Sequence, residues 1–402
     1  MKITDVKTHV VKMPSTMPWV FVSVETDEGV TGWGECTDYI ANPQLVRGIE
    51  AVKPFVVGID ASHIEEIWQR IFHMYSDLNG RGFVSHLISA IDIALWDIKG
   101  KVLDRPIYDL LGGPVRASVP LYTHVSDTSQ GDTFEDHLAG MMEDARRTKE
   151  MGFEAIKTDP FPSRRQYGKF RGAYMVERLE PAAIRESVQW MEGLREAVGD
   201  DYELMIDAHG RFDVASAIEA CRAMEHINLV WLEEPIHVEN HNALKHVREN
   251  VNVPLCVGER HFTRWDYWQI LNDRLVDYIM PDIAWCGGIS EIRRIAAMAE
   301  VAHIRISPHD ALGPIAIAAS FQTCMTMPNL YREECVHHWF PEFAKLIDPM
   351  FDVRDGHIHP NGRPGLGIEP IPEALEEYKV DVDAPEAQRT DWYGGANDDD
   401  DE

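Results

Sequence analysis

Three carboxylates follow three consecutive hydrophobic segments at equal intervals of 26 residues. Asp207 ends the segment ELMID, Glu233 lies in LVWLEEP and Glu259 lies in PLCVGER. That interval is about what a strand, a loop, a helix and a return loop require, so we expect the three acids at the same end of adjacent parallel strands. Converging carboxylates repel one another unless they share a cation, and hard oxygen ligands favour Mg²⁺. The spacing therefore predicts one magnesium site.

The series continues downstream of the three acids. Asp282, in YIMPDIAWCGG, follows Glu259 by 23 residues, and His309, in IRISPHDALGP, follows Asp282 by 27. A single Asp after a strand is usually a helix cap or turn residue, and a single His is usually structural. Five polar residues after five successive apolar runs instead indicate the face of an eight-stranded barrel at which catalytic groups gather.

The first part of the chain has a different pattern. Residues 3–13 and 19–36 alternate in hydrophobicity and predict a three-stranded antiparallel meander. Helical periodicity follows in PQLVRGIEAVKPFV, HIEEIWQRIFHMY and VSHLISAIDIALWDIKGKVL. We expect residues 1–115 to form an α+β domain.

Eight short apolar segments alternate with helical segments after residue 114. They are SVPLYTHV, FEAIKTD, YELMID, LVWLEE, PLCVGE, DYIMPD, HIRISPH and a last segment near NLYREECV. This alternation predicts parallel strands with right-handed crossovers, and eight such units close into a barrel. The predicted fold is α/β, a modified (β/α)8 TIM barrel over residues 116–340. Residues 341–402 should pack back on the first domain, with a disordered acidic tail at 397–402.

The composition narrows the class of partner. The chain has 67 acidic and 38 basic residues, and its net charge of -29 is typical of a halophile's surface and excludes nucleic acid as a natural partner. No apolar run is long enough to span a bilayer, and MKITDVKTHVVKM has no signal-peptide core, so we expect a cytoplasmic protein without a membrane partner. Six scattered cysteines without C-x-x-C spacing predict free buried thiols.

One basic segment interrupts this acidic chain. The stretch PFPSRRQYGKFRGAYMVERL, within 160–180, carries Arg164, Arg165, Lys169 and Arg171 after the second predicted barrel strand. A long loop at that place lies on the catalytic face. Two interpretations stay open: it closes over an anionic substrate, or it is a solvated loop or an oligomer contact.

With these residues located, the chain resembles the enolase superfamily, and within it the mandelate racemase subgroup, over essentially its whole length. The resemblance implies that the first domain is a capping domain, which governs substrate specificity and is completed by the C-terminal segment. The resemblance implies that Asp207, Glu233 and Glu259 bind one Mg²⁺ per subunit. It also implies an Asp-His dyad, in which His309 is the general base and Asp282 holds its ring. In that superfamily the base removes a proton next to a carboxylate, and the metal stabilises the resulting enediolate.

The second predicted strand departs from the racemase pattern. Racemases of this family commonly carry Lys-x-Lys there, because each face of the α-carbon needs a proton acceptor. This chain has Lys157-Thr158-Asp159 instead. Lys157 could contact the substrate carboxylate, whereas Asp159 is a poor base for so weak an acid. The strand therefore points away from racemisation.

The third predicted strand carries a histidine in the motif Asp207-Ala208-His209-Gly210-Arg211. This motif resembles that of sugar-acid dehydratases of the galactonate and mannonate type, in which such a histidine protonates the departing β-hydroxyl. Hydroxide is a poor leaving group, so an acid is needed at that position. The alternative is that His209 is the structural partner of a neighbouring loop.

Further candidate residues come from the ends of other strands. Glu334, in YREECVHH, resembles the family's eighth-strand glutamate that binds the substrate carboxylate, although the adjacent Glu333 leaves the register open. His124 could contact a distal hydroxyl or be structural. Tyr167 and Tyr174 lie in the basic loop, from which mannonate-type enzymes can supply a base, but the intact dyad favours His309.

These observations favour a Mg²⁺-dependent lyase, a hydro-lyase acting on an acid sugar. The expected substrate is an aldonate such as galactonate, gluconate, xylonate or mannonate, and the product a 2-keto-3-deoxy acid formed through an enediolate. One alternative is a racemase or epimerase of a 2-hydroxy acid or related carboxylate; another is a non-catalytic metal-stabilised barrel. The resemblance also suggests a homo-oligomer, a dimer or an octamer.

Overall fold

An antiparallel meander opens the chain. The computed structural model describes residues 1–78, 80–129, 131, 133–161 and 178–384. Its first strands are β1 (Ile3–Lys12), β2 (Pro18–Thr26) and β3 (Thr31–Glu35), which pair in that order. Gly29, with φ of 79°, allows the tight turn between β2 and β3. The meander predicted from the alternating sequence is confirmed.

Helices cover one face of the meander, and together they form the capping domain. They are α1 (Asn42–Val56), α2 (Ile64–Met74), α3 (Phe83–Leu103) and the short α4 (Ile107–Leu110). The central helix, α3, lies directly on β3. A Cβ atom at Gly34 would lie 1.9 Å from the carbonyl oxygen of Ala90, so glycine is what permits this close approach. The packing fixes the end of β3, at Glu35, against the rest of the molecule.

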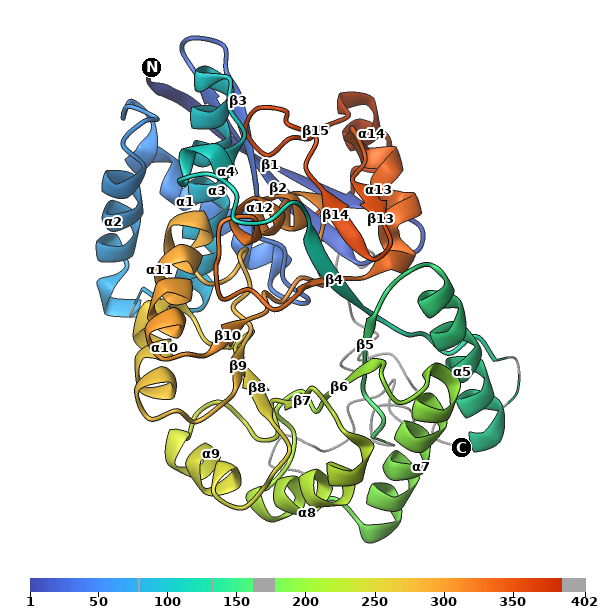
Figure 1. Cartoon of the computed structure of the whole chain (residues 1–402). Coiled ribbons are helices and arrows are strands. Elements are labelled where there is room, and N and C mark those ends of the chain that lie inside the picture. Colours follow the sequence, from blue (N-terminus) through green and yellow to red (C-terminus); the bar gives the residue numbers. More distant parts are fainter. Residues whose placement is uncertain (79, 130, 132, 162–177, 385–402) are drawn as a thin grey trace, which may run out of the picture.

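Eight parallel strands form the barrel (Figure 1). Each of β4 to β9 pairs with the next, and β11 pairs with β4. A parallel bridge between Ile306 of β10 and Leu330, three residues before β11, closes the ring. The strands are β4 (Val119–His124), β5 (Ala155–Thr158), β6 (Glu203–Asp207), β7 (Trp231–Glu233), β8 (Leu255–Val257), β9 (Tyr278–Ile279), β10 (Arg305–Ile306) and β11 (Glu333–Cys335).

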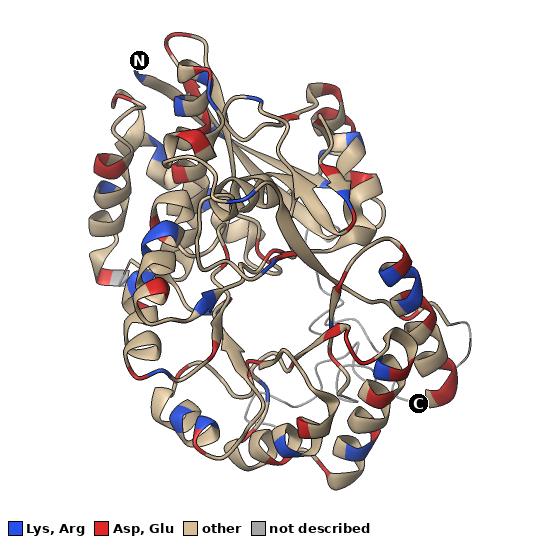
Figure 2. Cartoon of the chain, in the orientation of Figure 1, with Lys and Arg blue, Asp and Glu red and all other residues tan. Residues whose placement is uncertain are grey.

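Helices connect the strands and surround them (Figure 1). Among the described residues these are α5 (Phe134–Glu150), α7 (Pro181–Val198), α8 (Val214–Met224), α9 (His241–Arg248), α10 (Thr263–Asn272), α11 (Gly288–Val301) and α12 (Pro314–Cys324). Acidic and basic side chains gather on these outer helices (Figure 2), where water solvates them. The (β/α)8 barrel with an N-terminal α+β capping domain is the fold that the sequence predicts.

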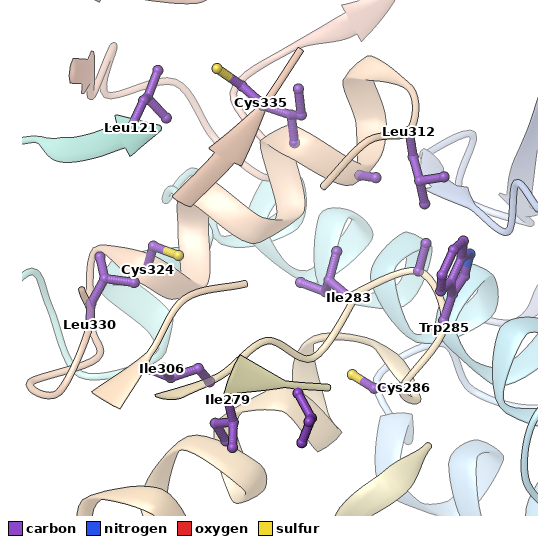
Figure 3. Close-up of a cluster of buried hydrophobic side chains, with 14 of the residues drawn as sticks. Leu121, Ile279, Ile283, Trp285, Cys286, Ile306, Leu312, Cys324, Leu330 and Cys335 are labelled. Atoms are coloured by element: carbon purple, nitrogen blue, oxygen red, sulfur yellow. The ribbon is translucent and has the colours of Figure 1, made fainter. Parts of the chain in front are cut away.

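The hydrophobic core has a layer inside the barrel and a layer between the strands and the helices. The inner layer is made by buried side chains from six barrel segments: Tyr122, Ala155, Met205, Trp231, Cys256 and Met280. The outer layer includes Ile279 and Ile306 of β9 and β10, and Trp285 and Leu312 of the loops that follow them (Figure 3). All six cysteines are buried and free, as the sequence predicts.

The C-terminal segment contacts both parts of the molecule. It runs through α13 (Phe340–Leu346), β12 (Ile347–Asp348), β13 (Asp352–Arg354), β14 (His357–His359), β15 (Glu369–Pro370) and α14 (Pro372–Glu377). Strand β14 pairs antiparallel with β4 of the barrel. Farther on, the backbone N–H of Val380 donates to the carbonyl of Val10 in β1. Within the described residues, every helix is too short or too polar to cross a membrane.

Candidate active site

The three acids predicted to bind a metal meet at the mouth of the barrel. Asp207 and Glu233 end the neighbouring strands β6 and β7 in direct register, and Glu259 follows β8 by two residues. One carboxylate oxygen from each acid lies within 4.8 Å of the others. All three side chains are buried. The structure thus brings together the triad that equal spacing along the sequence indicates.

The charges around the triad fit a divalent cation. Burial and the neighbouring charge of Asp207 raise the pKa of Glu233 well above its ordinary value. The ammonium group of Lys157 lies 3.0 Å from Glu233 and 3.6 Å from Asp207, so one charge on the protein faces two of the three carboxylates. Three hard oxygen donors with this excess of negative charge suit a cation such as Mg²⁺, and these are the residues that could hold it.

The predicted dyad stands beside the triad. Nδ1 of His309 lies 2.6 Å from Oδ2 of Asp282, and the other carboxylate oxygen of Asp282 accepts a hydrogen bond from the N–H of Ala284. The second ring nitrogen, Nε2, lies 2.9 Å from Oε2 of Glu259. His309 therefore presents one nitrogen to the aspartate that holds it and the other to the triad.

Electrostatics keep the His309 ring basic. Burial alone would lower its pKa, but the carboxylates of Glu259 and Glu334 outweigh burial and raise the pKa well above its ordinary value. A divalent cation bound to Glu259 and the rest of the triad would counter that rise. The ring of Trp285 lies 5.2 Å from the His309 ring and shields it from water on that side.

His209 reaches the triad from the other end. Its Nε2 lies 3.3 Å from Oδ2 of Asp207, and its Nδ1 lies 3.0 Å from Oδ2 of Asp159. Its backbone has φ of 53°, in the left-handed region, which turns the chain sharply after β6. Arg211 also contacts Asp159, at 2.9 Å. Asp159 therefore holds His209 in place much as Asp282 holds His309.

Glu334 links the remaining predicted residues. One of its oxygens lies 2.6 Å from Nε2 of His124 and 2.7 Å from Nζ of Lys157, while the other accepts a hydrogen bond from the N–H of Asp310. Among the described residues, neither oxygen of Glu333 has a hydrogen-bond partner, and its side chain is fully buried. Of the two adjacent glutamates, Glu334 is the one directed at the candidate site.

A cavity of about 300 Å³ opens beside this network. The residues that line it include His124, Asp127, His137, Lys157 and Asp159. Their side chains supply hydrogen-bond donors and acceptors suited to a polyhydroxylated molecule. A larger cavity of about 660 Å³ lies between α2, α3 and α11, on the outside of the molecule and away from the dyad and the triad.

The two parts of the fold each match a known family. Residues 3–112 match the mandelate racemase / muconate lactonizing enzyme N-terminal domain, and residues 140–374 match the family described as enolase C-terminal domain-like. The chain belongs to the enolase superfamily. The predicted fold and the resemblance to this superfamily drawn from the sequence are therefore confirmed.

Relatives of this enolase superfamily chain include named dehydratases. It is 31% identical over 398 residues to a D-galactonate dehydratase of Pectobacterium atrosepticum, and the matched region covers 98% of this chain and 97% of that protein. It is 32% identical over 393 residues to a D-mannonate dehydratase of Caulobacter sp. strain K31, which covers 93% and 94% respectively. Dehydratases are lyases, and this superfamily member is an enzyme of the lyase class.

Solved structures agree along nearly the whole chain. A mandelate racemase/muconate lactonizing enzyme-like protein from Rubrobacter xylanophilus superposes with a TM-score of 0.87 at 32% identity, over 94% of this chain and 98% of that one. An enolase superfamily member from Salmonella Typhimurium gives a TM-score of 0.87 at 29% identity, with the same two coverages. The agreement covers the capping domain and the barrel alike.

Two residues of the candidate site, Arg260 and Trp285, were not predicted from the sequence. Arg260 contacts the carboxylates of both Glu259 and Glu234, and Trp285 packs on the dyad histidine. Each follows a predicted site residue closely, Arg260 by one position and Trp285 by three, which is the signal that could have found them. The loop basic residues Arg164, Arg165, Lys169 and Arg171, and the tyrosines Tyr167 and Tyr174, lie outside the described residues.

Proposed function

We propose that this protein is a Mg²⁺-dependent dehydratase that converts an acid sugar to a 2-keto-3-deoxy acid. The observation that carries the proposal is the placement of two held histidines at opposite ends of one carboxylate triad. His309 contacts Glu259 and is held by Asp282, whereas His209 contacts Asp207 and is held by Asp159. Elimination of water from adjacent carbons needs one base that removes the proton and one acid that protonates the departing hydroxyl.

His309 is the base of the proposed reaction. Its Nε2 takes the proton from C2 of the sugar acid, and Asp282 accepts the hydrogen bond from Nδ1 and so keeps Nε2 free to act. Mg²⁺ bound by Asp207, Glu233 and Glu259 would stabilise the negative charge that develops on the substrate carboxylate. The Trp285 ring limits access of water to the base.

His209 is the acid of the proposed reaction. It donates a proton to the C3 hydroxyl as the C3–O bond breaks, so that water leaves rather than hydroxide. The electron pair of the C2–H bond forms the C2–C3 double bond of an enol. The enol then gains a proton at C3 while its C2 hydroxyl loses one, and so becomes the 2-keto-3-deoxy acid. The overall reaction releases one water and needs no oxidant or reductant.

Four further residues are proposed to bind the substrate. Lys157, which contacts Glu334 at 2.7 Å beside the triad, is placed to donate a hydrogen bond to the substrate carboxylate, and Glu334 is placed to accept one from a neighbouring substrate hydroxyl. His124 and Asp159 border the cavity of about 300 Å³, where the distal hydroxyl groups of a sugar acid fit.

The relatives support the class of substrate. Those compared above are named for D-galactonate and D-mannonate, both of them aldonates. We propose galactonate, mannonate, gluconate or xylonate as the substrate of this chain.

The proposed enzyme is a cytoplasmic homo-oligomer, a dimer or an octamer. We also propose that each subunit is divided into a capping domain (1–115), a catalytic barrel (116–340) and a C-terminal segment (341–402). The tail of that segment, 397–402, lies outside the described residues.

The test is a substrate screen that separates dehydration from its rival. The protein is incubated with Mg²⁺ in high salt and D₂O with hexonates, pentonates and aldarates, and the products are followed by ¹H NMR. Dehydration predicts loss of the C2 proton together with formation of a 2-keto-3-deoxy acid. Racemisation or epimerisation, with Lys157 as the opposing base, predicts C2 deuteration without loss of water. Absence of keto acid from every compound would refute the proposal.

A further inference from the structure

The helices that follow the two dyad loops lack caps of their own. Helix α11 follows the loop of Asp282 and begins after Gly287, and α12 follows the loop of His309 and begins after Gly313. Neither glycine has a side chain to accept the first backbone N–H groups of its helix. Three other barrel helices, α5, α8 and α9, carry their own capping residues, Thr133, Asp213 and Asn240.

Two carboxyl groups of the capping domain supply the missing caps. Asp92, on α3, accepts hydrogen bonds from the N–H of Ser290 at 2.9 Å and from its hydroxyl at 2.6 Å. Glu35, at the end of β3, accepts hydrogen bonds from the N–H of Gly313 at 2.8 Å and from that of Ala316 at 2.9 Å. Both carboxyl groups are buried. Each dyad loop is therefore tied at its far end to the capping domain.

Gly313 and Gly288, the first residue of α11, make room for these carboxyl groups. A Cβ atom at Gly313 would lie 2.5 Å from Oε1 of Glu35, and one at Gly288 would lie 2.6 Å from Oδ2 of Asp92. Both distances are too short for a side chain, so these two glycines allow the capping carboxyl groups to reach the helix ends.

The loop after Asp282 has further ties to the capping domain. The indole N–H of Trp285 donates to the carbonyl of Thr37 at 2.7 Å, and the hydroxyl of Ser85 donates to the carbonyl of Trp285 at 2.6 Å. The N–H of Gly287 donates to the hydroxyl of Ser89 at 2.9 Å. Helix α11 packs along α3, which carries Ser85 and Ser89 (Figure 1). Trp285 itself lies against the His309 ring.

We propose that Glu35 and Asp92 are positioning residues for the Asp282–His309 dyad. Each dyad loop is held at one end by its barrel strand and at the other by a helix whose start is fixed by the capping domain. The docked capping domain thereby sets the angle and distance of the hydrogen bond between Asp282 and His309. The expected effect of Glu35 and Asp92 on catalysis rests on the proposed function, whereas their effect on the dyad hydrogen bond does not.

The test reads the dyad directly. In protein labelled with ¹⁵N at histidine, the proton on Nδ1 of His309 is assigned by its loss in His309→Asn. At pH 8, above the pKa of about 7 that burial gives both carboxyl groups, we expect Glu35→Gln and Asp92→Asn to shift or broaden this resonance, because an amide offers one acceptor fewer to the helix N–H groups. With an active substrate, kcat should fall by ~10- to 100-fold while KM changes less than about threefold. Thr133→Val, which removes the cap of α5, is the matched control and should leave the resonance and kcat unchanged.

A second variant covers loss of folding. Gly313→Ala keeps Glu35 but places a methyl group against its carboxyl, and φ of -89° at Gly313 suits alanine. It should shift the same resonance. An unchanged resonance in folded Glu35→Gln, Asp92→Asn and Gly313→Ala would overturn the inference. A shifted resonance in a protein that dehydrates no sugar acid would leave the inference standing and refute the proposed function instead.

Discussion

Asp282 accepts a hydrogen bond from Nδ1 of His309 over 2.6 Å, across two loops that leave neighbouring strands of the barrel. The ring nitrogen that does not face Asp282 lies 2.9 Å from Glu259 of the carboxylate triad. The His309 ring is thus held at the edge of a carboxylate triad that could hold a divalent cation. This arrangement suits removal of a proton from the carbon next to a carboxylate.

Replacement of the base should abolish turnover without unfolding the protein. We expect His309→Asn to lower keto-acid formation by about 10³-fold or more, since no other described group is placed to replace its Nε2. The matched control is His226→Asn, an exposed histidine on the barrel surface that pairs with Glu192. Unchanged turnover in His309→Asn would favour a non-catalytic barrel over an enzyme.

Replacement of the acid should separate the two halves of the reaction. We expect His209→Asn to lower keto-acid formation by about 10²- to 10⁴-fold while C2 of the recovered substrate still exchanges with deuterium, because His309 and Asp282 are intact. ¹H NMR of the recovered substrate in D₂O measures the exchange. Equal loss of exchange and elimination would contradict the separate roles given to the two histidines.

Removal of the metal should act through the triad. Chelation with EDTA should abolish activity, and Mg²⁺ should restore it. Mg²⁺ at 100 times its Kd should stabilise the folded protein by about 2.7 kcal/mol, which appears as a rise in Tm. In Asp207→Asn that rise should disappear. A control with KCl at the same ionic strength separates specific binding of Mg²⁺ from general screening of the protein's charges. An equal rise in Tm with KCl alone would contradict a bound metal.

The fold and the five-residue series could be predicted from the sequence because both follow from local patterns. Strand and helix lengths set the equal spacing, and the carboxyl ends of parallel strands meet at one face. The positions of the three acids, of Asp282 and of His309 therefore follow from spacing, whereas the pairing of the last two as a dyad came from the family resemblance. The choice between Glu333 and Glu334 does not, because it depends on how β11 pairs with β4, which only the structure gives.

Contacts between the capping domain and the barrel could not be predicted. Glu35 and Ala316 are 281 residues apart, and Asp92 and Ser290 are 198 residues apart. No local periodicity links such pairs, since they meet only when two separately folded layers dock. The glycines at the starts of α11 and α12 did not indicate these contacts either, because glycine occurs at helix starts for several different reasons.

Stability should depend on the pH through Asp92. Burial raises its pKa to about 7, helped by Glu291 and opposed by Ser290 and Arg294. Because the folded-state pKa exceeds the ordinary value, this group stabilises the protein at low pH, and that contribution is lost as the pH rises through about 7. From pH 5 to pH 8 the wild type should lose about 2 kcal/mol that Asp92→Asn does not lose. Urea unfolding of both proteins at the two pH values measures the difference, and parallel behaviour would contradict the burial argument.

Salt should stabilise this acidic chain. With a net charge of -29, unscreened repulsion destabilises the compact state, and the Debye length shrinks from about 30 Å at 0.01 M to about 3 Å at 1 M salt. We expect Tm to rise steadily with KCl between these concentrations. A Tm that is flat or falls would show that the surface charge is not what limits stability.

The central claim is that one site removes a proton at C2 and releases the hydroxyl from C3. Its most direct test is to follow a converted sugar acid in D₂O with wild-type protein, Mg²⁺ and high salt, and to count keto acid formed against substrate consumed. The account predicts one 2-keto-3-deoxy acid for each substrate molecule lost, and none with His309→Asn. Deuterated substrate or its epimer accumulating without keto acid would contradict it.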